Sequence, residues 1–307
     1  MKKALATFVI GDEFKEFYKR FRESHVRYCE RFNWDLIEMT EPIIEVKCRK
    51  DIGTQKILVG TFEDYDTVVW IDSDVWITDN CPEIETKDPT KIGVTLEAPF
   101  GSLDVYDLVK KRRQWGSVKE YYELYGYIDP GLPNLNSGFI VFHPKVHAEY
   151  VRKIQSEMLE FAKGIPEIDK NGNHMHNDQP FLGTRLLKDD MYEVLDWRHN
   201  CIWPVYRCLL AEPYVNQGEL VRPIKTLMGF AYSLHFTDRE DIDVLEFVKN
   251  MESKDIVLTQ EEIDKGILFD PIFRLHEHNI KVPDGTQLKF PRNQYGFVIP
   301  KNISVIQ

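Results

Sequence analysis

The segment 66–79 has the sequence DTVVWIDSDVWITD, in which a strongly apolar run ends in two closely spaced carboxylates. Residues 68–71 are all β-branched or aromatic, a composition that predicts a buried strand. Asp72 and Asp74 follow directly, with only Ser73 between them. Because an ionised carboxylate is costly to bury unpaired, we expect a cation beside these two side chains.

A divalent metal ion holding a phosphorylated substrate is the first prediction from this arrangement. Ligands of open α/β sheets bind beyond the carboxyl ends of the strands. Mg²⁺ and Mn²⁺ favour oxygen ligands, which carboxylates and phosphates supply. The alternative is a solvated turn with two acidic residues, because Asp-x-Asp is a short pattern.

The composition excludes some classes of protein. The chain has 307 residues, of which 43% are hydrophobic, enough for one large α/β domain or a domain with a subdomain. A formal net charge of −11 argues against nucleic acid as a partner. The five cysteines form no Cys-x-x-Cys pair, which favours free thiols in a reducing compartment.

No transmembrane segment is expected, because no apolar run approaches roughly 18 residues. Residues 4–10 follow two lysines and mimic a signal peptide, but a buried first strand explains them better. We therefore expect a cytoplasmic protein, and the sequence does not indicate its oligomeric state.

The first third of the chain alternates between strand and helix patterns. Strands are expected at 4–10, 35–39 and 68–71, and helices at 13–32 and 52–62. This order predicts a parallel sheet with right-handed crossovers, as in the nucleotide-binding half of a Rossmann-like fold. No Gly-x-Gly-x-x-Gly follows the first strand, so dinucleotide binding is not supported.

The remainder of the chain continues the α/β pattern less regularly. Further strands are expected at 91–96, 139–142, 193–196 and 229–236, and helices at 146–162 and from Pro180, with Asp178 as the cap. Segment 99–133 carries a basic cluster at 110–113, either a solvated helix face or a contact for an anionic acceptor or membrane surface. Its tyrosines are either a subdomain core or stacking faces for sugar rings.

Five sites occur in a characteristic order along the chain. They are Lys56, which precedes Asp72 by 16 residues, the triplet Asp72-Ser73-Asp74, the turn Asn136-Ser137-Gly138, the pair Asp178-Gln179, and His235. This pattern resembles the metal-dependent GT-A glycosyltransferases, most closely family 8, which includes glycogenin and bacterial galactosyltransferases. The resemblance covers residues 4 to about 240 and implies a Rossmann-like nucleotide-binding sheet merged with a smaller acceptor-binding subdomain.

The resemblance implies a division into parts and a function. Residues 1–250 would form the GT-A domain, with a nucleotide-binding half at 1–98 and an acceptor half at 99–250, and residues 251–307 a tail packed on it. The protein would move a sugar from a nucleotide-diphosphate-sugar, with a UDP-sugar expected, to a hydroxyl of a glycan, protein or lipid-linked acceptor. The reaction would depend on a divalent metal and retain the anomeric configuration.

The resemblance also assigns roles to individual residues. Metal ligands would be Asp72, Asp74 and His235, and the imidazole nitrogen favours Mn²⁺ over Mg²⁺. Donor-binding residues would be Thr7, Phe14, Lys56, Asp72, Ser73, Asn136, Ser137, Gly138 and Arg239, with Phe14 against the base. The residues at the reacting carbon would be Asp178 and Gln179. Apart from the resemblance, the polar-aromatic composition of residues 197–203 is expected of a pocket wall, so Trp197 and Trp203, together with His176, are the candidate acceptor contacts.

The sequence departs from the family pattern after His235. Asp238 stands where the family's His-x-x-Gly-x-x-Lys has Gly, and no Lys-Pro-Trp follows. Arg239 is the residue that could supply the missing positive charge to the diphosphate.

Two other functions compete with this interpretation. A haloacid-dehalogenase-type phosphatase would use Asp72 as a nucleophile, with Lys188-Asp189-Asp190 imitating its later motif. Against it, that motif normally lies on the first strand, whereas a β-α-β-α unit precedes Asp72 here. The other is a non-catalytic sugar-binding module, which would keep the fold without needing metal.

Each site also has an ordinary structural alternative. Lys56 could be a solvated helix lysine, residues 136–138 an ordinary turn, and His235 a strand-end histidine. His174 and His176 could ligate metal, but we favour loop residues near the acceptor.

Overall fold

The computed structural model describes residues 1–45, 49–97, 122–127, 134–166, 178–210, 231–237, 245–246, 248–249, 256–259 and 303–306. The chain divides into two compact units, which are described separately. Unit 1 comprises Met1–Ile77, Glu83–Glu97 and Gly116–Asp196, and unit 2 comprises Thr78–Pro82, Ala98–Trp115 and Trp197–Gln307.

Unit 1 is built on a six-stranded sheet with the order β2-β1-β3-β6-β5-β7. Its strands are β1 (Lys3–Phe8), β2 (Asp35–Met39), β3 (Thr67–Ile71), β5 (Ile92–Leu96), β6 (Leu135–Phe142) and β7 (Tyr192–Val194). Strands β1, β2 and β3 are parallel, as the strand–helix alternation predicted. Strand β6 runs antiparallel to both β3 and β5, so the sheet as a whole is mixed.

Strand β6 begins earlier than predicted and contains the expected polar turn. Its register with β5 jumps between Val94, opposite Ile140, and Thr95, opposite Asn136. Within this irregular stretch, the Asn136 side-chain oxygen accepts a hydrogen bond from the Gly138 N–H at 2.8 Å. The register shift, together with this side-chain bond, marks residues 136–138 as a bulge within the strand.

The described helices of unit 1 follow the predicted segments, but two of these segments are divided: residues 12–32 form two α-helices, and residues 49–61 form an α-helix followed by a 3₁₀ helix. They are α1 (Asp12–Tyr18), α2 (Arg22–Phe32), α3 (Arg49–Thr54), the 3₁₀ helix η1 (Gln55–Thr61), α6 (Pro144–Gly164) and α7 (Gln179–Lys188). The single helix predicted at 13–32 is wrong. The chain tightens at residues 19–21, where Phe21 N–H bonds to the Tyr18 carbonyl and the Phe21 side chain becomes fully buried.

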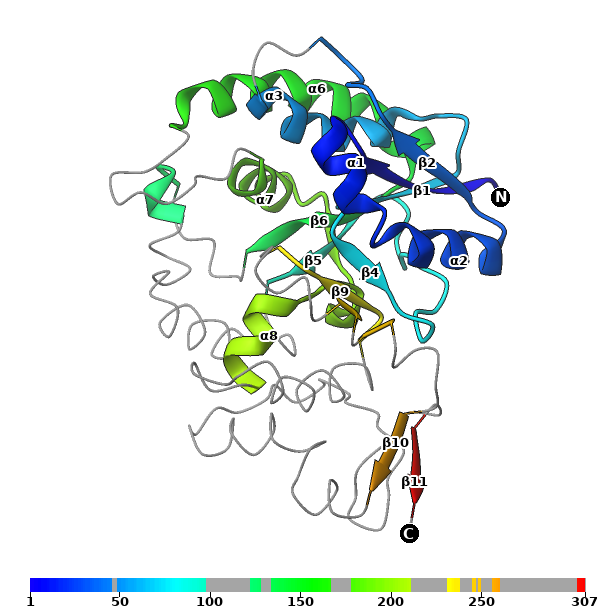
Figure 1. Cartoon of the computed structure of the whole chain (residues 1–307). Helices are drawn as coiled ribbons and strands as arrows, with labels where there is room; N and C mark the ends of the chain where they lie inside the picture. Colours follow the sequence, from blue (N-terminus) through cyan, green and yellow to red (C-terminus); the bar gives the residue numbers. More distant parts are fainter. Residues whose placement is uncertain are drawn as a thin grey trace. The chain divides into compact units, whose positions relative to one another are not determined.

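Two layers of helices cover the sheet. Alternate residues of the central strands, including Ala4, Ala6 and Trp70, belong to one core with apolar residues of η1 and α6. Gly60 of η1 lies so close to β6 that a Cβ there would be 2.7 Å from the Phe142 ring. Helix α2 packs on β1 and β2, and Figure 1 shows it on the other side of the sheet from α6.

The short strand β4 (Val75–Ile77) follows the acidic turn, and helix α2 holds it in place. The Ser24 hydroxyl accepts a hydrogen bond from the Ile77 N–H at 3.1 Å. His25 lies with Nε2 2.8 Å from the Val75 carbonyl and Nδ1 3.1 Å from the Tyr18 hydroxyl. His25 is therefore a fully buried core histidine.

Unit 2 contains η3 (Trp197–Asn200), β8 (Cys201–Ile202), α8 (Trp203–Leu210), β9 (Ser233–His235), β10 (Ile256–Thr259) and β11 (Ile303–Ile306). Strands β8 and β9 pair in parallel, as do β10 and β11. Strand β9 is only part of the strand predicted at 229–236. Among the residues described here, no helix has both the length and the apolar character needed to cross a bilayer.

Candidate functional site

The acidic turn lies where β3 ends, in the middle of the unit 1 sheet. Asp72 is the first residue after β3, and its N–H donates to the Gly138 carbonyl of neighbouring β6 at 2.9 Å. The Asp72 carbonyl accepts from the Val75 N–H at 3.2 Å, which closes a tight turn into β4. The turn thereby fixes the backbone on both sides of Asp74, and both carboxylates are half-buried.

Lys56 connects this turn to two other parts of unit 1. Its ammonium lies 2.9 Å from Asp178 and 3.3 Å from Asp72, and it donates to the Ser137 carbonyl and hydroxyl at 3.4 and 3.3 Å. Its side chain is only 10% exposed. Burial lowers the pKa of Lys56, but the carboxylates of Asp178 and Asp72 more than offset this, so the net pKa is raised. Lys56 is a buried cation, not a solvated helix lysine.

One oxygen of Asp72 is held by two donors. Asp72 Oδ1 accepts from the indole N–H of Trp70 at 2.9 Å as well as from Lys56. Charge-assisted bonds of this kind fix the orientation of a carboxylate. The same oxygen is therefore poorly placed to act as the nucleophile of a phosphatase.

Asp178 occupies the N-cap position of α7, as predicted, but its side chain makes no capping hydrogen bond. The carboxylate pairs with Lys56 instead. Gln179, the first residue of the helix, is also buried, and its amide points back toward β6. Asp178 therefore occupies the N-cap position that the sequence predicted and also contributes its carboxylate to the site.

Glu97 is a site residue that the sequence analysis missed. It follows β5, and its carboxylate accepts hydrogen bonds from the side-chain amides of Asn134, Asn136 and Gln179 at 3.2, 3.1 and 2.8 Å. The only signal in the sequence is an acidic residue directly after the strand predicted at 91–96. Its partners become visible only once β5 and β6 are known to pair.

His235 ends strand β9 in unit 2, and its ring orientation is set by Asn200. Nδ1 of His235 lies 3.0 Å from the side-chain oxygen of Asn200. Because an amide oxygen can only accept, Nδ1 carries the proton and Nε2 keeps the lone pair that a metal ion needs. Asn200 is the second residue that the sequence analysis did not identify.

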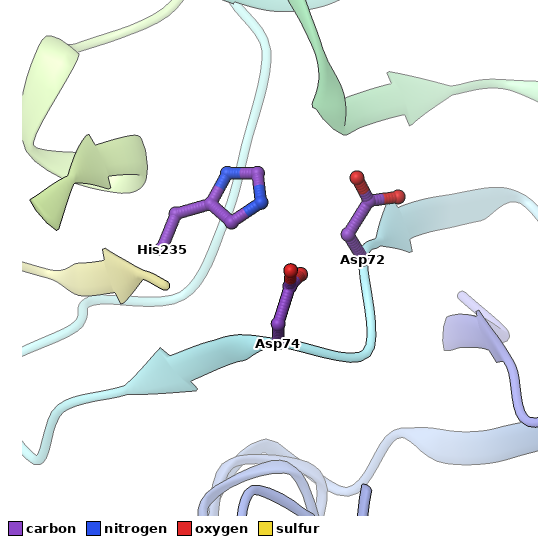
Figure 2. Close-up of side chains that lie close together, drawn as sticks. All are labelled: Asp72, Asp74 and His235. Atoms are coloured by element: carbon purple, nitrogen blue, oxygen red, sulfur yellow. The ribbon is translucent and has the colours of Figure 1, made fainter. Parts of the chain in front are cut away.

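Asp72, Asp74 and His235 each offer one ligand atom, and these atoms lie within 4.8 Å of one another. Figure 2 shows the three side chains directed toward the same space. Two carboxylates and one imidazole form a donor set that suits Mn²⁺. Among Asp72, Asp74, Asp178 and Lys56, three negative charges face one positive charge, a balance that a divalent cation would neutralise.

The other predicted donor residues differ in how they are placed. Thr7 is fully buried in β1, and its hydroxyl has no hydrogen-bond partner among the described residues. Phe14 lies on α1 and is partly exposed, and Ser73 is half-buried within the acidic turn. Arg239 lies outside the described residues.

The predicted acceptor residues also fall into separate groups. Trp197 is partly exposed and stacks on Tyr206 with ring centroids 6.2 Å apart. Trp203 is fully buried beside Phe236, so it offers no free ring face to a sugar. His176 lies outside the described residues, as does the basic cluster at 110–113.

Comparison with solved structures decides the fold class. A crystal structure of a glycosyltransferase involved in the glycosylation of the major capsid of PBCV-1 superposes with a TM-score of 0.51 at 16% identity, covering 80% of this chain and 100% of that one. The fold is that of a GT-A glycosyltransferase. The fold class predicted from the sequence is thereby confirmed.

Two further structures with the GT-A fold are more distant. The galactosyltransferase LgtC, solved with donor and acceptor sugar analogues, gives a TM-score of 0.46 at 14% identity, with 77% of this chain and 87% of that chain covered. The glycosyltransferase GlyE of Streptococcus pneumoniae TIGR4 gives 0.47 at 14% identity, with 94% and 66% covered. No protein-family model matches the chain. No curated protein matches its sequence either.

Proposed function

We propose that this chain is a glycosyltransferase that transfers a sugar from a UDP-sugar to a hydroxyl group of a glycan or other acceptor, with the help of a divalent metal ion and with retention of configuration. One observation carries the proposal. Within a GT-A fold, Lys56, Asp72 and Asp178 come from distant parts of the sequence and meet at the end of the central strand β3.

The charge of the site explains why a metal ion is part of the proposal. A diphosphate would be repelled by Asp72, Asp74 and Asp178, which Lys56 alone does not neutralise. Asp72, Asp74 and His235 would hold a Mn²⁺ or Mg²⁺ ion, which supplies charge neutralisation to the leaving diphosphate. Asn200 would keep Nε2 of His235 available as a ligand.

The sugar would lie beside Lys56, Asn136 and Asp178, whose polar side chains suit its hydroxyls. Gln179 is already hydrogen-bonded through both ends of its amide, to Glu97 and to the Ser137 N–H. We therefore assign the negative charge nearest the reacting carbon to Asp178 and a supporting role to Gln179. The departing diphosphate oxygen would accept the proton of the acceptor hydroxyl.

The remaining contacts of the donor and acceptor follow the family pattern. Thr7 and Phe14 would contact the nucleoside, because they lie on β1 and on the helix that follows it. Arg239 would face the diphosphate. Trp197 and His176 would contact the acceptor.

A hydrolysis assay tests the proposal. The purified chain is incubated with a panel of UDP-sugars in Mn²⁺ or in EDTA, and free UDP is measured. We expect slow UDP release that needs metal and that is lost in Asp74→Asn. Asp64 is exposed, and Asp64→Asn serves as the matched control, which should release UDP at the wild-type rate. Hydrolysis of p-nitrophenyl phosphate, or no turnover of any UDP-sugar with Mn²⁺, would overturn the assignment.

A further inference from the structure

Glu97 accepts hydrogen bonds from three side-chain amides at the site, and the proposed function assigns it no role of its own. We infer that Glu97 is a positioning residue that fixes the side chains of Asn136 and Gln179 for the sugar half of the donor. The inference rests on the proposed function and adds a specificity-determining residue to it. Every contact that carries it lies within unit 1.

The chemistry of the network fixes the direction of each amide. An ionised carboxylate can only accept, so the NH₂ groups of Asn136 and Gln179 must both face Glu97, at 3.1 and 2.8 Å. Their oxygens then act as acceptors. The Asn136 oxygen accepts from the Gly138 N–H at 2.8 Å, and the Gln179 oxygen accepts from the Ser137 N–H at 3.3 Å and from the Asn136 NH₂ at 3.4 Å.

These two amides hold the backbone that touches Lys56. The bond from Gly138 to Asn136 defines the bulge in β6, and Ser137 within that bulge accepts from Lys56 through its carbonyl and its hydroxyl. Gln179 is the first residue of α7, directly after Asp178. Glu97 therefore anchors both segments that bring polar groups to Lys56.

A neutral amide at position 97 would break this directionality. Glu97→Gln keeps the size of the side chain but places one NH₂ group among the NH₂ groups of its partners. One or more charge-assisted bonds are lost, so Asn136 and Gln179 are held in this orientation only by their bond to each other and by the backbone N–H groups of Ser137 and Gly138. The metal ligands Asp72 and Asp74 do not contact Glu97 in any of these bonds, so binding of the diphosphate half should persist.

The experiment compares two ligands in the same variant. Affinities for UDP and for the UDP-sugar that the wild-type chain hydrolyses are measured by titration calorimetry with Mn²⁺. We expect Glu97→Gln to bind UDP within about twofold of wild type, while UDP-sugar affinity and turnover fall by roughly 10- to 100-fold. Glu97→Asp keeps the carboxylate and should therefore retain more of the UDP-sugar affinity and of the turnover than Glu97→Gln does.

Controls separate this role from general stability. The largely exposed Glu85→Gln should match wild type in both affinities. If Glu97→Gln does not fold, as judged by thermal unfolding, Glu97→Asp must by itself weaken UDP-sugar binding more than UDP binding. Equal losses for the two ligands, or unchanged UDP-sugar affinity, overturn the inference while wild-type turnover still supports the proposed function. Absence of wild-type turnover overturns both.

Discussion

Replacing Lys56 by Met tests how strongly the site depends on one buried cation. The ammonium lies 2.9 Å from Asp178 and 3.3 Å from Asp72, so each Coulomb attraction is about 5–6 kcal/mol at an effective dielectric constant of about 20. Most of this attraction offsets desolvation in the native protein. Removing one partner, however, leaves the carboxylates without compensation, at a typical cost of about 3–5 kcal/mol.

Proton uptake sets an independent upper limit on this cost. A carboxylate that stays buried in Lys56→Met can become neutral by binding a proton. Protonating a carboxylate with a normal pKa of about 3.9 costs about 4 kcal/mol at pH 7. We therefore expect the free energy of unfolding at pH 7, without metal, to fall by about 3–5 kcal/mol. The difference in the free energy of unfolding between wild type and Lys56→Met should shrink as the pH falls toward 4, because the folded variant then binds the proton at little cost.

Urea denaturation with and without Mn²⁺ measures both effects. Mn²⁺ should stabilise Lys56→Met more than wild type, because one competing positive charge is gone. The control Lys145→Met removes an exposed ion pair with Asp66 at 2.7 Å and should cost much less stability than Lys56→Met. If Lys56→Met loses no more stability than Lys145→Met, the view of Lys56 as a buried counter-ion is refuted.

Three other predictions follow from packing, titration and metal ligation. Gly60→Ala should destabilise the chain by about 1–3 kcal/mol, because the new Cβ would lie 2.7 Å from the Phe142 ring. Gly53→Ala is the control, since the space around Gly53 is open and no destabilisation is expected. Urea denaturation of the two variants compares them. Burial, and then the neighbouring His143, lowers the pKa of His147 to about 4. The free energy of unfolding should therefore fall by up to about 3 kcal/mol as the pH is lowered from 6.5 to 4, because the unfolded state binds the proton more readily. Denaturation curves across this range should show a smaller pH dependence for His147→Gln than for wild type. Asn200→Ala should weaken Mn²⁺ binding by roughly 10- to 100-fold in calorimetric titration, because Nδ1 of His235 loses its acceptor; unchanged affinity would contradict the tautomer assignment.

The fold was predictable where local patterns agree with tertiary structure. Residues 35–39 and 68–71 lie in β2 and β3, and the alternation around them gave the parallel part of the sheet. The antiparallel direction of β6 was not predictable, because an apolar run of this kind carries no sign of its direction. The break in the helix at residues 19–21 also depends on burial of Phe21 rather than on local propensity.

The candidate site was predictable from the order of its motifs but not from single residues. Lys56 in isolation resembles any helix lysine, and only its spacing from Asp72 marked it. Glu97 and Asn200 act through partners on other strands and helices, at Gln179 and His235, and such pairings leave no trace in one sequence. Burial of Trp203 was hidden for the same reason, because an aromatic residue in a polar stretch suits a pocket wall and a core equally.

We propose above all that Asp72 and Asp74 bind a divalent cation that holds the donor's diphosphate. The most direct test is anomalous diffraction at the manganese edge from crystals grown with Mn²⁺ and UDP. We expect a single strong peak bound by Asp72, Asp74 and Nε2 of His235 on one side and by both phosphates of UDP on the other. A peak elsewhere, or UDP bound with no metal between its phosphates and the two aspartates, would contradict it.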